Sequence, residues 1–512
     1  MAKRILTIIT LFHFYIFTFC FRALAQDTLW VRYDDRFRDN TAVRIADVDS
    51  FEFKNGQVMV DNKTTTIPID AADMLFKDPG RILLKPNSYR ETNYTSKTSK
   101  EGYNFSHSME SEHFAVFWDV RFGNDPSHLS IGGQTASASN ILGIAERCWK
   151  TYVEELGFLV PGKSTTDHYK IQLYVPYQSE WRADASGDDG QRPDGSWSKT
   201  GLGHFNPWAA NARGGHTIAH EVGHTFQYLV SADLGMEHGF NYGYGDGASG
   251  GNGWWESCAD WQAYKIFPDR QFTDGEYFEG HLPLCHLNLM HENWRYQNCF
   301  VQDYWCMKHG QDFIGRLWRE SRKPEDPVEA YQHLCGLTLQ QFADEQMEGF
   351  MRMATWDIDG VREAAAHRIG QHRNCLKAVG DGVWRVDAAY CPQNFGYNIT
   401  NMKTATAGTT VTAHFKGIAG ADGYSKIKTD KAGWRYAFVA LMNTGERIYG
   451  DIQQDKEGTA TLTIPTNKGT CRNLFFVVMG APTQYWRHPW DDDASNDEQW
   501  PYEVTFENTQ PK

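Results

Sequence analysis

The segment from His216 to Gln227 holds the residues of this chain best suited to chemistry. It reads HTIAHEVGHTFQ and contains the motif H-E-x-x-H, with His220 and His224 four residues apart. On a helix this spacing puts both imidazoles on one face, from which they can bind a single tetrahedral zinc ion. Glu221 would then point at the zinc-bound water and act as its general base. The motif therefore predicts a catalytic zinc site.

A third zinc ligand is expected in the segment WWESCADW, some thirty residues further on. Glu256 is the predicted ligand. Asp260 lies one helical turn later on the same face and is predicted to hold the N–H of a zinc-binding imidazole. His238 and Asp246 are the alternative third ligands. His216 also lies on the face of His220, but its place at the expected start of the helix favours a role at the cleft edge or as a cap.

The elements that position these residues can be read from the surrounding pattern. Ile218, Val222 and Phe226 form an apolar face that would anchor the metal-binding helix to the core. Upstream, strands over 113–120 and 169–175 flank a helix over 136–156, and this order indicates an α/β or α+β layer. Downstream, the chain is expected to be mostly helical to about residue 368, with helices over segments such as 313–320 and 338–353.

The two motifs together resemble the gluzincin clan of zinc metallopeptidases, which has a thermolysin-like architecture. The resemblance implies that His220, His224 and Glu256 bind zinc. It also implies that Glu221 is the general base and that Asp260 orients a histidine. With the upstream segment HFAVFW, the motifs further resemble an uncharacterised family of secreted bacterial gluzincin-like proteins over roughly residues 110–512. A metzincin motif would need Gly at 227 and His at 230, where this chain has Gln and Val.

The resemblance also implies a substrate-binding edge strand and a donor to the oxyanion. Thermolysin-like enzymes carry an Asn-Ala pair on the edge strand, and the nearest match here is the segment 206–211, with Asn206, Trp208 and Ala209. Tyr296 and His291 are the candidates for the side chain that donates to the oxyanion opposite the zinc.

The pattern of the whole chain predicts an α+β fold in several parts. Residues 26–86 are predicted to form a small β module, because short strands flank the pair Asn55-Gly56. A Ser-, Thr- and Asn-rich stretch over 87–108 is predicted to be a polar linker. The zincin-like catalytic domain, a mixed sheet with a helical subdomain, is expected over 109–393, and alternating strands predict a β-sandwich over 394–512.

The first 25 residues are expected to form a signal peptide. A basic start is followed by an apolar run from Ile5 to Phe21 and by the exit sequence Ala23-Leu24-Ala25. Cleavage near Ala25 predicts a secreted, periplasmic or cell-surface protein, and a retained signal anchor is the alternative. No later segment is long and apolar enough to predict a transmembrane helix.

Composition limits the partners and cofactors. The chain has 50 Lys and Arg against 64 Asp and Glu, a formal charge of −14, which argues against nucleic acid as a partner. One catalytic zinc ion is the expected cofactor. Calcium is a weaker expectation that rests on carboxylates in the Gly- and Asp-rich stretch 184–200, which is favoured to be a solvated loop. These carboxylates are Asp184, Asp188, Asp189 and Asp194.

The predicted function is zinc-dependent hydrolysis of peptide bonds in a protein or glycoprotein, such as an extracellular host or matrix protein. One alternative is a glycan- or surface-binding protein with an inactive zincin-like domain, since aromatic rings, many of them in the C-terminal domain, can stack on sugars. This alternative rests on Trp254, Trp255, Trp486, Trp490 and Trp500. A second alternative is hydrolysis of a non-protein amide or ester. The Gly- and Tyr-rich segment 241–252 is expected to be a cleft wall or lid, or only a long connection.

Overall fold

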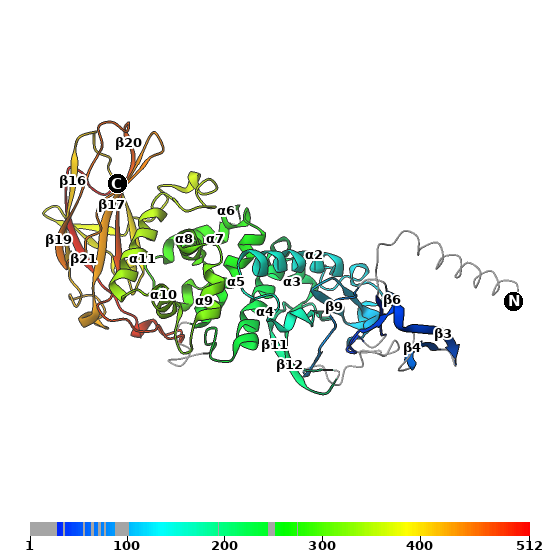
Figure 1. Ribbon diagram of the computed structural model, residues 1–512. Helices are drawn as coiled ribbons and strands as arrows, with labels where there is room; N and C mark the ends of the chain where they lie inside the picture. The colour runs from blue at the N-terminus through cyan, green and yellow to red at the C-terminus, as the bar shows by residue number, and fades with distance from the viewer. Residues whose placement is uncertain are drawn as a thin grey trace.

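The fold was analysed in a computed structural model, which describes residues 28–33, 36–54, 57–62, 66–69, 73–75, 78–87, 102–192, 194–243, 251–273 and 275–512. The predicted signal peptide, most of the predicted linker, Asp246 and most of the predicted lid lie outside these ranges. Figure 1 shows an elongated molecule with the first strands at one end, helices in the middle and the last strands at the other end. The α+β fold class is confirmed.

The N-terminal strands form two small three-stranded sheets. One has the order β2(Thr41–Arg44), β1(Thr28–Arg32), β6(Asp73–Leu75), and the other has the order β3(Val48–Lys54), β4(Gln57–Asn62), β5(Thr66–Ile69). Strands β3 and β4 pair antiparallel, as the Asn-Gly signal predicts. Only a small apolar core, formed by Leu29, Val31, Tyr33 and Val43, lies in the first of these sheets.

A six-stranded mixed sheet supports the middle of the molecule. Its order is β7(Lys85–Pro86), β11(Ala183–Gln191), β12(Trp197–Phe205), β10(Ile171–Val175), β9(Phe114–Trp118), β8(Ser108–Glu110). Strands β9, β10 and β12 are parallel, whereas β8 and β11 run antiparallel to their neighbours. Every residue of β9 and β10 is buried, which explains why both read as continuous apolar runs.

Helix α4(His216–Leu234) lies between this sheet and helix α5(Gly251–Ile266). The expected helix after β9 is α2(Ala138–Trp149), which continues as a π-helical segment over Lys150–Glu155. From that segment, the hydroxyl of Tyr152 donates a hydrogen bond of 3.0 Å to the carbonyl oxygen of Ala219 on α4. Helix α4 is thus fixed from both sides.

Further helices follow α5 and form the middle of Figure 1. They are α6(Arg270–Thr273), α7(Gly275–Leu284), α8(Cys299–His309), α9(Phe313–Glu320), α10(Pro327–Cys335) and α11(Leu339–Met353). The predicted helices over 313–320 and 338–353 are confirmed. Thr338 begins the latter with a capping box, in which its side chain accepts from the N–H of Gln341.

The C-terminal strands form two packed sheets. One has the order β13(Leu376–Gly380), β14(Val383–Val386), β21(Tyr502–Glu507), β16(Thr410–Gly417), β19(Glu457–Thr463), and the other β15(Tyr397–Met402), β20(Cys471–Gly480), β17(Trp434–Met442), β18(Arg447–Tyr449). Strand β17 is buried throughout, because one face meets the other sheet and the other face meets α11. Strands β13 and β14 precede the expected boundary at residue 394; β14 pairs with β21 near the end of the chain, and a local pattern cannot reveal such a pairing.

Two local predictions near helix α4 are wrong. The predicted loop over 184–200 is largely the hairpin of β11 and β12, since pairing along the whole of β11 outweighs its Gly- and Asp-rich composition. The predicted edge strand over 206–211 is helix α3(Pro207–Asn211). Asn206 caps this helix by accepting a hydrogen bond from the N–H of Ala209, and a proline follows at the first helical position, where it is well tolerated. Asn206, Trp208 and Ala209 therefore do not form a strand.

Two further observations on the described residues concern membrane-spanning helices and disulfide bonds. None of the described helices is long and apolar enough to cross a bilayer. All nine cysteines from Cys148 to Cys471 lie in the described part of the chain, and each is a free thiol there.

Candidate metal centre

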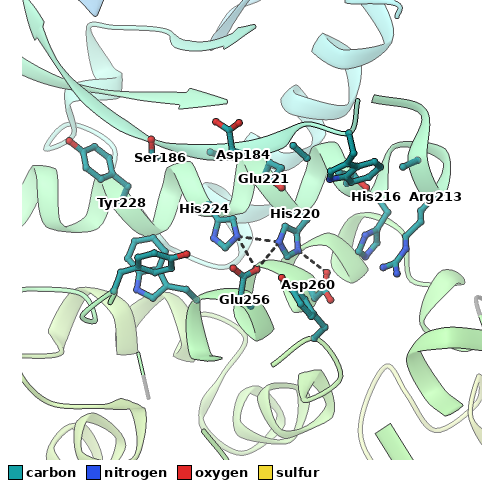
Figure 2. Close-up of a pocket in the computed structure, with 18 of the residues that line it drawn as sticks. Asp184, Ser186, Arg213, His216, His220, Glu221, His224, Tyr228, Glu256 and Asp260 are labelled. Carbon is teal, nitrogen blue, oxygen red and sulfur yellow. Dashed lines mark hydrogen bonds and ion pairs between the residues drawn. The ribbon is translucent and has the colours of Figure 1, made fainter. Parts of the chain in front are cut away.

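Three side chains from two helices converge on one point (Figure 2). The Nε2 atoms of His220 and His224 lie 3.1 Å apart. The Oε2 atom of Glu256 lies 3.2 Å from Nε2 of His220 and 3.4 Å from Nε2 of His224. Ligand atoms bound to one tetrahedral zinc ion at 2.0–2.1 Å are about 3.3 Å from each other. The three ligand atoms therefore already have the spacing of a metal site.

The protonation of the two imidazoles also fits a metal ion. Nδ1 of His220 lies 2.7 Å from Oδ1 of Asp260, and Nδ1 of His224 lies 2.9 Å from Oε1 of Gln227. Because both partners are acceptors, each Nδ1 carries a proton, and each Nε2 is the nitrogen that faces the other two ligand atoms. With a metal ion bound, both Nε2 atoms would offer lone pairs beside the carboxylate oxygen; without one, a proton on Nε2 would bond Glu256. This donor set is one that a metal ion such as zinc requires.

Asp260 behaves as its position in the motif predicts, whereas Gln227 was not identified from the sequence. The amide nitrogen of Gln227 donates to the carbonyl of Trp255 at 3.2 Å and to Oε1 of Gln262 at 3.1 Å, which leaves its oxygen facing His224. The available signal was spacing: Gln227 follows His224 by three residues and so lies on the same helical face.

Gly223 explains how α4 and α5 approach closely enough to share one metal ion. A Cβ atom at this position would lie 2.9 Å from Oε1 of Gln262 and 3.4 Å from Cα of Ala259. Glycine costs about 1 kcal/mol in the middle of a helix relative to alanine. Here that cost permits the contact between the helix that carries both histidines and the helix that carries Glu256.

The triad lies on the wall of a cavity of about 720 Å³. Strand β11 forms another wall through Ala183 to Ser186, and Glu221 also lines the cavity. In Figure 2, Glu221 lies on the β11 side of the two imidazoles, towards Asp184. Burial raises the pKa of the Glu221 carboxyl, although the neighbouring imidazoles act in the opposite direction. A carboxylate with a raised pKa beside a metal site is suited to accept and return a proton.

Tyr296 is the predicted oxyanion donor that the structure brings to this cavity. Its ring centroid lies 6.2 Å from that of His220, and it lines the cavity with 39% of its surface exposed. Burial and then the charge of Glu256 raise its pKa to about 12, so its hydroxyl keeps the proton that it would donate. His216 lines the cavity as well, at the first position of α4, and is outside the triad.

His291 is placed elsewhere, and the expectation that it faces the metal is wrong. It caps the short 3-10 helix Glu292–Trp294, where its Nδ1 accepts from the N–H of Asn293 at 3.0 Å. Its Nε2 therefore carries the proton and donates to Oδ2 of Asp497 at 3.1 Å. Sequence order placed His291 correctly between α5 and α8, but order does not fix which surface a side chain faces.

His291, His488 and Asp497 form a second group whose ligand atoms lie within 4.8 Å of one another. Hydrogen bonds already account for it. The ring of His488 stacks on that of His291 with centroids 4.7 Å apart, and its Nε2 lies 2.8 Å from Oε2 of Glu292. Since Nε2 of His291 is a donor, it has no lone pair for a metal ion. We interpret this group as a set of hydrogen bonds that holds the C-terminal segment against the loop before α8.

The other proposed ligands have different partners. Nδ1 of His238 bonds the carbonyl of Arg319 at 2.8 Å, so His238 is not the third ligand of the triad. The carboxylates considered for calcium are spread along the β11–β12 hairpin. Asp184 accepts from His204 and Arg182, Asp189 pairs with Lys199, and Asp194 accepts from Ser196. Neither described group of ligand atoms contains any of these carboxylates or Asp188.

Residues 76–512 match the model of DUF6055, a family of unknown function, and the chain belongs to that family. None of the curated proteins compared with the chain matches it. Two solved structures show distant likeness. One, from a study of promiscuous carbohydrate-binding modules of the β-sandwich superfamily, has 12% identity and a TM-score of 0.16, with 25% of this chain and 45% of that chain covered. The other, a GH115 4-O-methyl-α-glucuronidase with specificity for decorated arabinogalactans, has 8% identity and a TM-score of 0.14, with 49% and 44% covered.

Proposed function

We propose that the chain is a zinc-dependent metallopeptidase with His220, His224 and Glu256 as zinc ligands. The observation that carries the proposal is the convergence of two Nε2 atoms and a carboxylate oxygen beside Glu221, on the wall of a cavity of about 720 Å³. When bound, zinc would supply a Lewis acid and lower the pKa of a water molecule to about 7. The first 25 residues support export of the mature protein.

The residues of the chain have separate roles in this proposal. Glu221 takes the proton of the attacking water and returns it to the leaving amine. Tyr296 donates its hydroxyl proton in a hydrogen bond to the oxygen of the scissile carbonyl, where negative charge develops. Asp260 and Gln227 hold the two imidazoles in the tautomer and orientation that metal binding needs.

Strand β11 is the proposed binding edge for the substrate. It pairs with β12 along its full length, but on its other side, among the described residues, it pairs only with β7, at Gly190 and Gln191. The part from Ala183 to Ser186 lines the cavity and leaves main-chain groups for an extended peptide. A peptide that adds to this edge as a strand would pass the metal site with its backbone fixed by hydrogen bonds.

The test is metal analysis of the mature protein beside Glu221→Gln and Glu256→Ala, with casein digestion on the same samples. We expect about one zinc per chain in the wild type and in Glu221→Gln, less zinc in Glu256→Ala, and loss of proteolysis in both variants. Glu154→Gln, at an exposed position, is the matched control and should resemble the wild type. A folded wild-type protein without zinc would overturn the proposal, whereas zinc without proteolysis would redirect it to a non-protein amide or ester.

A glycosylated substrate is the more specific proposal, supported by two exposed tryptophans at the cavity. Trp181 lines the cavity and is 47% exposed, and Trp208 is 51% exposed. Their rings meet edge to face with centroids 5.4 Å apart. Such rings offer apolar faces on which a sugar can stack. Of the tryptophans first considered for glycan binding, Trp254, Trp490 and Trp500 are buried and less suited, whereas Trp255 lines the cavity.

This second proposal predicts a difference between glycosylated and bare substrate. The double variant Trp181→Ala, Trp208→Ala should digest a mucin-type glycoprotein about tenfold more slowly and its enzymatically deglycosylated form at the wild-type rate. Trp197→Ala removes a tryptophan that is as exposed as Trp181 but lies at the start of β12, outside the cavity lining, and is the control. Equal losses on both substrates would show that the tryptophans only shape the cleft.

A further inference from the structure

One end of the cavity is lined by the turn before α4 and by the first turn of that helix. Ala212, Arg213, His216 and Thr217 line this end of the cavity. In Figure 2, His224, His220, His216 and Arg213 follow one another from left to right, so this end lies on the far side of His220 from His224. Neither Arg213 nor Thr217 has a part in the function proposed above.

The backbone of this turn is strained in a way that fixes the place of Arg213. Arg213, Gly214 and Gly215 are all left-handed, with φ of 49°, 60° and 99°. A non-glycine residue in this region is strained, and such strain tends to occur at functional sites. A Cβ at Gly214 would lie 2.5 Å from Nη2 of Arg270, at the far end of that side chain. Two guanidinium groups thus lie near the turn.

The start of α4 adds further positive potential. The helix has 19 residues, and its N-cap is Gly215, which supplies no side-chain cap. The first N–H groups of a helix carry partial positive charge and favour an anion. A helix N-terminus by itself does not make an anion site, but the buried side chain of His216 is a second feature that points to a ligand.

His216 is a buried side chain whose hydrogen bonding is incomplete. It is only 1% exposed, it lines the cavity, and its Nε2 has no hydrogen-bond partner among the described residues. A buried polar atom without a partner destabilises the fold, so one in a cavity wall points to a ligand that would bond it. Aromatic neighbours hold the ring in place, with the centroid of Tyr264 at 4.5 Å. The carboxylates nearest the metal are already engaged, since Asp260 bonds His220 and Glu256 belongs to the triad.

We propose that Arg213, His216 and the N-terminus of α4 form a subsite for a carboxylate of the substrate. This inference rests on the proposed peptidase function and names its specificity. His216 precedes His220 by one helical turn, about 6 Å along the axis, which is the span of about two residues of an extended peptide. The carboxylate therefore belongs to an acidic side chain, or to a free C-terminus, within about two residues of the scissile bond.

Peptide substrates that differ in one charge test this subsite. The mature enzyme is first given a mixed library of acetylated, amidated peptides, and cleavage sites are read by mass spectrometry; we expect Asp or Glu to be enriched within two residues of the cut. A matched Glu/Gln peptide pair should then differ at least tenfold in kcat/KM. The same peptide with a free or an amidated C-terminus separates the two sources of the carboxylate: a preference for the free form indicates trimming from the C-terminus.

Two variants test whether this subsite causes the preference for the Glu peptide. Arg213→Asn removes the charge but keeps a residue that tolerates the left-handed conformation, and it should bring the Glu/Gln ratio to within about twofold of 1. His216→Phe keeps an aromatic ring without its nitrogens and should also reduce the ratio. Lys428→Asn is the control, because Lys428 is another basic residue with left-handed φ, of 47°, in the C-terminal domain.

Measurements of peptide binding test this inference independently of the peptidase proposal. Fluorescence anisotropy of the labelled Glu and Gln peptides on Glu221→Gln, which should not turn them over, measures the preference without catalysis. Equal binding and equal cleavage of both peptides would overturn the carboxylate subsite and leave the peptidase standing. If no peptide is cut but the Glu peptide still binds at least tenfold more tightly, the subsite is supported and the peptidase proposal fails.

Discussion

At the scale of single residues, the candidate centre depends on proton positions as much as on ligand identity. His220 and His224 can present bare Nε2 atoms only because Asp260 and Gln227 accept the protons on the opposite nitrogens. The two acceptors differ in kind. A carboxylate adds negative charge near the metal, whereas an amide only orients the ring.

Gln227→Met tests this orienting role. It removes the acceptor at nearly constant volume, so the ring of His224 is free to rotate or change tautomer. Loss of such a hydrogen bond typically costs 10- to 100-fold in metal affinity. We expect the zinc dissociation constant, from competition with a chelating dye, to rise by that factor while the far-ultraviolet circular dichroism stays unchanged.

The matched control is Gln346→Met in α11. Gln346 is equally buried and accepts a hydrogen bond from Trp305 at 2.9 Å, but it does not line the metal cavity. This variant should lose stability without any change in zinc affinity. Equal zinc affinity in the wild type and in Gln227→Met would show that Gln227 has no orienting role.

At the scale of elements, the closest approach of two helices decides whether one ion can be shared. Gly223 on α4 faces Ala259 and Gln262 on α5. Gly223→Ala would push Gln262 away, and Gln262 is bonded to Gln227, which orients His224. Overpacking a buried contact costs typically 1–3 kcal/mol. We expect a lower unfolding midpoint and at least tenfold weaker zinc binding, measured by calorimetry.

Gly143→Ala in α2 is the control for this substitution. No atom lies within 4 Å of a Cβ built there, so only helix propensity changes, by about 1 kcal/mol in favour of alanine. It should stabilise the protein and leave zinc binding alone. If Gly223→Ala behaved in the same way, the contact between α4 and α5 would be less restrictive than its distances indicate.

The elements also show what the sequence could predict. The spacing of His220 and His224 predicted two of the ligands, because helical periodicity is local and places such side chains by itself. Glu256 lies on another helix and was predicted from the segment WWESCADW and its resemblance to the gluzincin motif. Strand β11 was missed, since a Gly- and Asp-rich segment becomes a strand only through pairing with β12. Gly187 shows the reason for that composition: any Cβ there would overlap the ring of Tyr228 on α4. His291 was misplaced because its partner Asp497 lies some two hundred residues away.

At the scale of the whole molecule, the C-terminal segment joins the two β-sheets to the region that carries the metal centre. His488 and Asp497 from this segment bond Glu292 and His291 in the loop before α8. The same loop continues to Arg295, whose guanidinium lies over the rings of Tyr296 and Trp490. The position of Tyr296 in the cavity therefore depends on how this segment is docked.

The buried pair of His488 and Glu292 makes this docking sensitive to pH. Burial acts to lower the pKa of His488, but its bond to Glu292 and the charges of Asp497 and Glu498 outweigh burial and raise it. Burial acts to raise the pKa of Glu292, yet the hydrogen bond from His488 leads the interactions that outweigh burial and lower it to about 2. The contribution of His488 to stability is thus complete below its ordinary pKa of 6.5 and is lost as the pH rises through the raised value. That of Glu292 is complete above 4.5 and is lost as the pH falls towards 2.

The stabilisation from this pair should therefore be largest between about pH 4.5 and 6.5. His488→Gln removes the cation and leaves Glu292 buried without its partner, a change that costs about 3 kcal/mol in buried ion pairs. We expect the unfolding midpoint of the variant to lie furthest below that of the wild type near pH 5.5, with the gap narrowing at higher pH. His414→Gln removes the histidine of an exposed pair with Glu507 and should show a small gap at every pH. If the unfolding midpoint of His488→Gln stayed below that of the wild type by the same amount from pH 5 to 9, the imidazole would act through packing rather than charge. The docking of this segment would then not depend on pH.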